Sequence, residues 1–224
     1  MCGIIEGGEV QSNLDAYYNA QAAVYRSWGP ALARRLQSSA DRAAYEEDMR
    51  QLDSAIAKHL GGSRFVVDVG CGPSRLRTTS HDQSLVLVDR SPAMLHEARS
   101  FHGSCSRVYT QACGTMLPLA NGVADLAICT FLLSHLDDLA FPQVLREITR
   151  VLRPGGVAVI ADSACSIVPT AAADIQTRIA ADGRSYRVPK YYRCPSDVGA
   201  AFHGGALQLA GTARFVFTLE WSNV

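Results

Sequence analysis

The sequence predicts an α/β fold built around a doubly wound, mostly parallel β-sheet. Beyond residue 62, short apolar segments alternate with helical ones, which is typical of strands joined by crossover helices. The strand segments are almost continuously apolar, as expected of a parallel sheet that is covered on both faces. Two final apolar segments, residues 206–212 and 215–221, are separated by a short turn and predict an antiparallel hairpin.

Ahead of this sheet domain, residues 1–62 are predicted to form an N-terminal helical arm. Apolar side chains recur at steps of three and four from residue 45 to residue 60, which is one face of a helix. Asp41 is the expected N-cap, and the glycine pair at 61 and 62 ends the helix. We therefore expect residues 1–62 to be an arm or lid and residues 63–224 to be the domain that carries the site.

Within the sheet domain, each predicted element follows from its apolar pattern. The helix at residues 91–100 has Pro92 in its first turn, and the helix at residues 141–152 is closed by a Pro-Gly-Gly sequence. The predicted strands are residues 65–69, 85–88, 104–110, 124–130 and 157–161. With the final hairpin they make a seven-stranded sheet.

Composition and charge exclude several classes of partner. Of 224 residues, 48% are apolar, which suits one α/β unit with an extra arm. Lys and Arg number 21 and so do Asp and Glu, so net charge gives no reason to bind nucleic acid or an anionic membrane. We find no apolar run long enough to cross a bilayer and no signal peptide. The seven cysteines include no C-x-x-C pair and no zinc-like spacing with histidine, so we expect reduced thiols, no metal and a cytoplasmic location.

A glycine-rich turn carries the main functional signal. The predicted strand ends at Asp68 and is followed by Gly70 and Gly72, whose missing side chains allow a ligand to approach the backbone closely. A dinucleotide site needs a third small residue where this chain has Arg75, which argues against NAD or FAD. Asp89 ends the next strand, 21 residues after Asp68, where an acid can accept hydrogen bonds from both hydroxyls of a ribose. A lone G-x-G is also found as a simple turn, but the combination indicates a nucleoside-type cofactor.

Several segments resemble the class I S-adenosylmethionine-dependent methyltransferases. The matching stretches are VVDVGCGPS, LVLVDRSPAML, CGTMLPL, ADLAICTFLLSHL and LRPGGVAVIAD, within roughly residues 64–163. The resemblance implies a Rossmann-like fold that binds S-adenosyl-L-methionine and releases S-adenosyl-L-homocysteine, without a metal. It places Asp68 beneath the amino-acid end of the cofactor, Asp89 at the ribose and Arg90 beside the adenine. The implied cofactor-binding residues are Asp68, Gly70, Cys71, Gly72, Asp89, Arg90, Met94, Cys113, Gly114, Thr115, Thr130 and Phe131.

Two positions depart from the family's usual pattern. Cys113 stands where the family usually has an Asp that contacts the adenine amino group, and Ser74 replaces the third glycine of the turn. Main-chain amides can supply the adenine contacts, so neither change excludes binding.

Candidate catalytic residues follow the fourth and fifth strands. His135 is the leading candidate for a general base, because the pKa of histidine lies near neutrality. The alternative is a histidine that only shapes its loop or contacts the cofactor. Asp162 can position an amine or hydroxyl of the acceptor, or it can cap the next segment. In related small-molecule methyltransferases the N-terminal arm folds over the cofactor, so Tyr18 and Tyr25 are candidates to close the site, unless they are ordinary core aromatics.

The acceptor site is predicted from a basic segment at residues 182–193. Arg184, Arg187 and Lys190 alternate there with tyrosines, and insertions at this place in the common plan form part of the acceptor site. We hypothesise that one of these cations binds an acidic group of the acceptor. The alternative is an edge strand blunted by solvated charges.

Taken together, the sequence predicts methyl transfer to a small-molecule acceptor, with oxygen favoured over nitrogen as the nucleophile. One alternative is an enzyme of the same fold that catalyses a cyclisation or rearrangement without methyl transfer. Another is a non-catalytic binding subunit, for which Cys113 and Ser74 are the support. We find no basic face and no added recognition domain in the sequence, so we do not expect a nucleic-acid or protein acceptor. A monomer and a homodimer both remain open.

Overall fold

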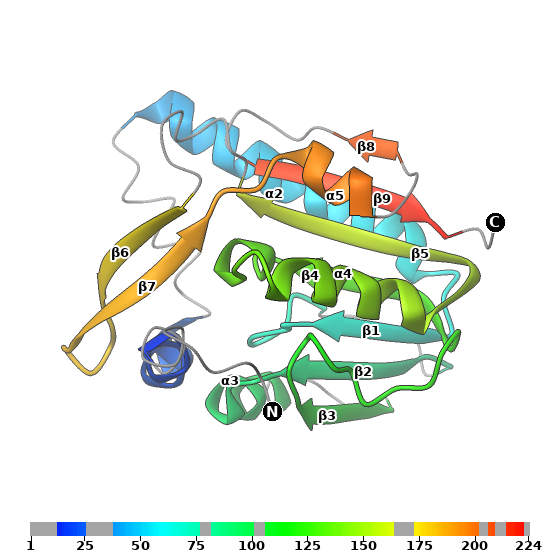
Figure 1. The fold of residues 1–224 in the computed structure, drawn as a ribbon, viewed down its shortest axis with the longest axis horizontal. Coiled ribbons are helices and arrows are strands. Elements are labelled where there is room, and N and C mark those ends of the chain that lie inside the picture. The colour runs from blue at the N-terminus through cyan, green and yellow to red at the C-terminus, as the bar shows by residue number, and fades with distance from the viewer. Residues whose placement is uncertain are drawn as a thin grey trace.

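The computed structural model describes residues 13–25, 38–76, 82–100, 106–163, 173–201, 206–208 and 214–221. Its centre is a seven-stranded sheet with the order β3-β2-β1-β4-β5-β9-β8 (Figure 1). The strands are β1 Phe65–Val69, β2 Ser84–Asp89, β3 Arg107–Gln111, β4 Ala124–Thr130, β5 Leu152–Ser163, β8 Ala206–Gln208 and β9 Arg214–Glu220. The first five pair in parallel, β9 runs antiparallel to β5, and β8 runs antiparallel to β9. The predicted fold class is confirmed.

Helices cover both faces of this sheet, which explains the continuous apolar runs. The helices are α2 Ser39–Leu60, α3 Pro92–Arg99, α4 Ala140–Val151 and α5 Pro195–Ala201. Neighbouring strand residues point to opposite sides, so Val66 packs with Leu52 of α2 in one apolar cluster and Val67 packs with Val144 of α4 in the other. The core therefore has two layers, one on each side of β1 and β4.

Two helix ends differ from the sequence prediction. The N-cap of α2 is Ser38, whose Oγ accepts a hydrogen bond from the backbone N–H of Asp41 at 3.1 Å. The prediction of Asp41 as the cap was wrong, because Ser38 lies three residues earlier and places its hydroxyl at the first unpaired amides. At the other site, α4 ends at Val151 and the chain enters β5 at Leu152, so the Pro-Gly-Gly sequence lies inside the strand.

A second, two-stranded sheet stands apart from the main one. Strands β6 Ala173–Ile179 and β7 Ser185–Tyr191 form an antiparallel hairpin. A helix at residues 13–25 packs against this hairpin through a third apolar cluster that includes Tyr17 and Val188. In Figure 1 the parallel strands point toward the side where this helix and the hairpin lie. The carboxyl edge of the sheet is thus the edge that both elements flank.

The two helices that precede residue 62 lie in different places. The N-terminal helix, residues 13–25, meets the hairpin, whereas α2 contributes Leu52 and Ile56 to the core of the main sheet. Trp28, within the predicted arm of residues 1–62, lies outside the described residues.

The structure describes four of the seven cysteines. Cys71, Cys113 and Cys129 are free thiols, but Cys194 is disulfide-bonded, so the expectation that every cysteine is reduced was wrong. The spacing of the cysteines alone could not predict this disulfide, because a disulfide depends on which distant segments meet in the fold.

None of the described helices is both long and apolar enough to span a bilayer. Among the described residues, His, Cys, Asp and Glu form no cluster able to hold a metal ion.

Candidate functional site

The turn after β1 presents an open backbone surface at the carboxyl edge. Gly70 and Gly72 have φ of 67° and 51°, the left-handed region that glycine adopts readily. The backbone N–H of Gly70 donates to the carbonyl of Val88 at 2.8 Å, which fixes the turn against β2. A Cβ on Gly70 would meet the Leu132 side chain at 2.9 Å, whereas a Cβ on Gly72 would meet none of the described residues within 4 Å. The turn is therefore packed on one side and open on the Gly72 side.

Asp89 is attached directly to this turn. Its Oδ2 accepts a hydrogen bond from the Gly72 N–H at 2.7 Å, and its Oδ1 accepts one from the Ser91 N–H at 2.8 Å. Burial raises the pKa of Asp89, and backbone N–H groups oppose that rise because they stabilise the carboxylate. These bonds hold the acid at the end of β2 beside the open glycine.

Asp68 lies deeper under the turn. Its side chain is buried, and its Oδ2 accepts a hydrogen bond from the Ser74 hydroxyl at 2.8 Å. Burial raises the pKa of Asp68 to about 7, despite the opposing effect of the Ser74 hydrogen bond. A cation placed beside this carboxylate would restore its charged form.

The remaining predicted cofactor residues surround the same strand ends, in varied environments. Arg90 is exposed and pairs with Asp15 of the N-terminal helix at 2.8 Å. The loop after β3 lies beside β2, because the Ala112 N–H donates to the carbonyl of Asp89 at 3.1 Å. Phe131 follows β4 in a left-handed conformation, with φ of 58°.

The other members of that set divide into buried and half-buried groups. Cys71 is buried and Met94 is buried within α3, so neither presents its side chain to solvent. Gly114 is closely packed, since a Cβ there would meet Val69 at 3.3 Å. The half-buried residues are Cys113, Thr115 and Thr130, and the Thr115 hydroxyl contacts the Cys113 sulfur at 3.0 Å.

His135 is engaged through both ring nitrogens. Its Nδ1 lies 2.9 Å from the carbonyl oxygen of Pro189, so Nδ1 carries the proton and donates it. Its Nε2 is then the acceptor for the Tyr18 hydroxyl, at 2.7 Å. Burial, together with the charges of Lys190 and Arg178, holds the pKa of His135 well below its usual value. The histidine is therefore neutral and already hydrogen-bonded on each side.

Of the three cations predicted at the acceptor site, one is buried. Lys190 is buried, and its Nζ lies 2.5 Å from the Ser134 Oγ and 3.7 Å from Oδ1 of Asp162. Arg184 and Arg187 are exposed. Arg187 lies one residue from buried Val188, so it faces the other side of β7.

Asp162 joins this cation to the 3₁₀ turn that holds His135. It is fully buried, and its Oδ2 accepts a hydrogen bond from the Ser134 N–H at 2.9 Å. The hydrogen bond to the Ser134 N–H agrees with a capping role for Asp162. The proximity of Lys190 agrees equally with a role in positioning the substrate.

A second cation, Arg178 of β6, was missed by the sequence analysis. Its guanidinium lies 5.8 Å from the ring centre of Tyr17, and its charge acts on His135. It also donates to Oε1 of Gln176 at 2.7 Å. The segment 173–179 is mostly polar, so the sequence did not predict it as a strand. Without a predicted strand, the sequence could not indicate which face Arg178 occupies.

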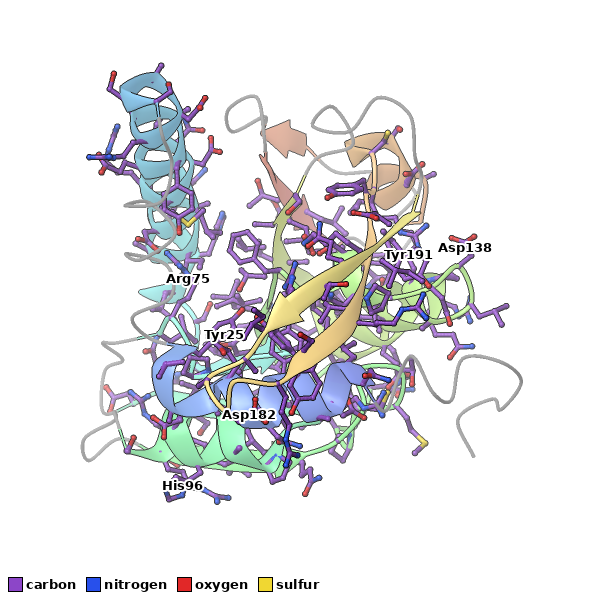
Figure 2. All side chains as sticks on the ribbon, turned by 90° about the vertical axis from the view of Figure 1, so that its left-hand side faces the viewer. Tyr25, Arg75, His96, Asp138, Asp182 and Tyr191 are labelled. Atoms are coloured by element: carbon purple, nitrogen blue, oxygen red, sulfur yellow. The ribbon has the colours of Figure 1, made fainter. Side chains whose placement is uncertain are left out.

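The N-terminal helix presents one face to this side of the molecule. Tyr18 and Tyr25 are 5.9 Å apart between ring centres, and burial raises the pKa of Tyr25 to about 12. Gln21, one helical turn from each, is 8% exposed, and its Oε1 has no hydrogen-bond partner among the described residues. The helix is tied to the start of α3, because the Ser91 hydroxyl donates to Oδ1 of Asn19 at 2.6 Å. Figure 2 views the hairpin and this helix from their own side, with Asp182 marking the turn of the hairpin.

These features fit a nucleoside ligand that also carries a cation. The open Gly72 allows close approach, Asp89 offers a carboxylate at the strand end, and Asp68 is a buried carboxylate with a raised pKa. Gln21 adds a buried acceptor without a partner among the described residues.

Residues 67–160 match the family described as a methyltransferase domain, from β1 through the glycine turn and Asp89 to β5. This match supports the resemblance of residues 67–160 to the class I S-adenosylmethionine-dependent methyltransferases. Curated relatives support this methyltransferase assignment. An uncharacterized methyltransferase of Mycobacterium sp. (strain KMS) is 34% identical over 126 residues, covering 54% of this chain and 46% of the relative. The malonyl-[acyl-carrier protein] O-methyltransferase of Enterobacter lignolyticus (strain SCF1) is 31% identical over 129 residues, covering 56% and 50%. The chain spans about half the length of these relatives.

Solved structures share the fold of this chain over nearly its whole length. The DhpI–SAM–HEP complex has a TM-score of 0.71 at 19% identity, covering 96% of this chain and 99% of its own. The Burkholderia thailandensis 1,6-didemethyltoxoflavin-N1-methyltransferase has a TM-score of 0.58 at 17% identity, covering 100% and 93%. At these identities the likeness concerns the fold alone.

Proposed function

We propose that this methyltransferase transfers the methyl group of S-adenosylmethionine to an oxygen of a small molecule that carries an acidic group. The observation that carries the cofactor part is the 2.7 Å hydrogen bond between the Gly72 N–H and Asp89. It joins the open turn after β1 to the acid that ends β2, so the two separate motifs lie together. When bound, S-adenosylmethionine supplies an electrophilic methyl group on a sulfonium.

The chain's residues would hold the cofactor by complementary chemistry. Asp89 accepts hydrogen bonds from ribose hydroxyls, and the open side of Gly72 admits the nucleoside close to the backbone. Asp68 faces the cationic amino-acid end. Tyr18 and Tyr25 of the N-terminal helix close the site and exclude water, which strengthens electrostatic interactions inside it.

An acidic acceptor is favoured by the charges around His135. Lys190 and Arg178 both act on the neutral histidine, while Asp162 is the carboxylate that faces Lys190. Two cations and one carboxylate leave a net positive charge among these side chains. An anionic group on the acceptor would balance that charge in a partly buried setting, where ion pairs are weakly screened.

The same geometry suggests how the acceptor is activated. The Nε2 lone pair of His135 is occupied by the Tyr18 hydroxyl, so the histidine is better placed to position Tyr18 than to take a proton from the acceptor. An acidic oxygen is already ionised near neutral pH and needs no general base. Much of the rate would then come from holding that oxygen near the methyl group.

The first test is isothermal titration of the protein with S-adenosylmethionine and with S-adenosylhomocysteine, beside an Asp89→Ala variant. We expect micromolar binding of both ligands by the wild type and its loss in the variant. Absence of binding by the wild type would contradict the proposal and favour a non-catalytic subunit.

The second test is an acceptor screen that follows S-adenosylhomocysteine formation. Small carboxylates and phosphorus oxyacids are compared with their neutral esters, with and without EDTA, because we propose that no metal is needed. We expect turnover with acids only and no effect of EDTA. A product formed without S-adenosylhomocysteine would instead indicate a cyclisation or rearrangement.

A further inference from the structure

Ser74 holds a backbone conformation that favours glycine. Its φ is 54°, in the left-handed region that side chains with a Cβ rarely adopt. It stands where the turn of the family usually has its third glycine. A role for the serine side chain would explain why this strained position is not glycine.

That side chain makes two hydrogen bonds under the turn. The hydroxyl donates to Oδ2 of Asp68 at 2.8 Å and accepts from the Leu76 N–H at 3.2 Å. Both Ser74 and Asp68 are buried, with 8% and 3% of their surface exposed. Because carboxylate hydrogen bonds are strong when water is excluded, Ser74 fixes the orientation of Asp68.

Among the described residues, Asp68 has one cation whose charge acts on it. The charged and titratable groups that act on it or respond to it are Asp89, Arg75, Cys71 and Cys129. That cation is Arg75, whose effect on the pKa of Asp68 is the smallest of the causes and whose guanidinium forms its ion pair with Asp53, at 2.7 Å. The buried carboxylate is thus oriented and partly stabilised by one neutral hydroxyl.

We propose that the Ser74 hydroxyl is a positioning group that aims the Asp68 carboxylate at the cationic amino-acid end of the cofactor. It thereby selects ligands that carry this end over nucleosides that lack it. The inference rests on the proposed function and deepens it, because it assigns a role to a residue outside the glycine pair. A purely structural role, in which the hydroxyl only caps the turn through Leu76, is the competing explanation.

The experiment compares Ser74→Gly and Ser74→Ala with the wild-type chain. Both variants remove the hydroxyl, but Gly relieves the left-handed strain and Ala retains it, so thermal unfolding separates folding effects from binding effects. Binding is measured by titration with S-adenosylmethionine, S-adenosylhomocysteine and 5′-methylthioadenosine, which lacks the amino-acid part. Each titration with S-adenosylmethionine is repeated between pH 6 and pH 8.5.

We expect both variants to bind S-adenosylmethionine and S-adenosylhomocysteine about tenfold more weakly, as for the loss of one charge-assisted hydrogen bond. Binding of 5′-methylthioadenosine should change less than about twofold on the same argument. The pH at which S-adenosylmethionine affinity is half lost should rise, because the hydroxyl no longer stabilises the carboxylate. Ser74→Gly should unfold at the wild-type temperature or above.

Two outcomes would overturn the inference while the proposed function stands. One is unchanged S-adenosylmethionine affinity in Ser74→Gly. The other is an equal loss of 5′-methylthioadenosine, which would show general distortion of the site. If the wild type binds none of the three ligands, the proposed function fails and the inference fails with it.

Discussion

Tyr18 of the N-terminal helix donates a 2.7 Å hydrogen bond to Nε2 of His135, 117 residues away in the sequence. The two rings also meet edge to face, with 5.5 Å between their centres. Because Nδ1 of the same histidine bonds to Pro189 in the hairpin, one imidazole links the N-terminal helix, the edge of the main sheet and β7.

Tyr18→Phe removes the hydroxyl and keeps the ring. We expect looser docking of residues 13–25, because Nε2 of His135 would be a buried acceptor without its partner, a loss of about 1–3 kcal/mol. Hydrogen exchange in residues 13–25 should become faster, and S-adenosylmethionine should bind more weakly. Tyr186→Phe is the matched control, since its hydroxyl bonds to Asp182 at the surface. Unchanged exchange in Tyr18→Phe would show that the hydrogen bond does not hold the helix.

His135 should also make stability fall in mild acid. Its pKa in the folded protein is lowered, chiefly by burial, so the unfolded chain takes up a proton near pH 6.5 and the folded chain does not. This contribution is fully present above pH 6.5 and is lost as pH falls below it. Urea unfolding at pH 7.5 and pH 5.5 should therefore show a smaller drop for His135→Gln than for the wild type. Parallel pH dependence in both proteins would contradict a neutral, buried His135.

The parts of this site that were predictable are local in sequence. The glycine turn, Asp89 and the strands that carry them lie in contiguous motifs whose geometry follows from strand ends and glycine conformations. The environment of His135 was not predictable, because it depends on Tyr18 and Pro189, which are distant along the chain.

The acceptor side shows a second reason why sequence was insufficient. In a strand, a shift of one residue reverses which side chains face inward, so a run of alternating cations cannot say which of them is buried. The structure buries Lys190 and exposes Arg187 on the same strand. Arg178 was missed because polar residues lie on both faces of β6, so the alternation of apolar and polar residues that predicts a strand is interrupted there.

Lys190 and Arg187 therefore form a matched pair for testing the acceptor site. Lys190→Met should raise the KM for an acidic acceptor by about tenfold or more, because a charge-assisted contact is lost, while S-adenosylmethionine affinity stays unchanged. Arg187→Met, on the exposed side of the strand, should leave both values unchanged. Steady-state kinetics with the best acid from the screen measures this. Equal KM values for Lys190→Met and the wild type would remove the lysine from the acceptor site.

Asp68 is expected to trade stability for binding. Its folded pKa is raised to about 7 by burial, so its contribution to stability is fully present below the unfolded pKa near 4 and is lost as pH rises to about 7. Asp68→Asn keeps an acceptor for Ser74 but cannot ionise. Without ligand it should be more stable than the wild type at pH 8, by on the order of a few kcal/mol, and similar at pH 4. Urea unfolding at the two pH values tests the sign, and titration should show loss of S-adenosylmethionine binding.

A variant of Gln21, on the N-terminal helix, should affect protein stability and ligand affinity in opposite directions. Its Oε1 is buried without a hydrogen-bond partner among the described residues, which destabilises the ligand-free protein by about 1–3 kcal/mol. Gln21→Met keeps the length of the side chain and removes the amide, so the ligand-free variant should be as stable as the wild type or more stable. If a bound ligand donates to this oxygen, affinity for that ligand should fall by about tenfold. Gln51→Met, at an exposed position of α2, is the control, and unfolding with and without ligand gives both the stability and the affinity. A variant that is destabilised without ligand but binds normally would show that Gln21 serves packing of the helix rather than recognition.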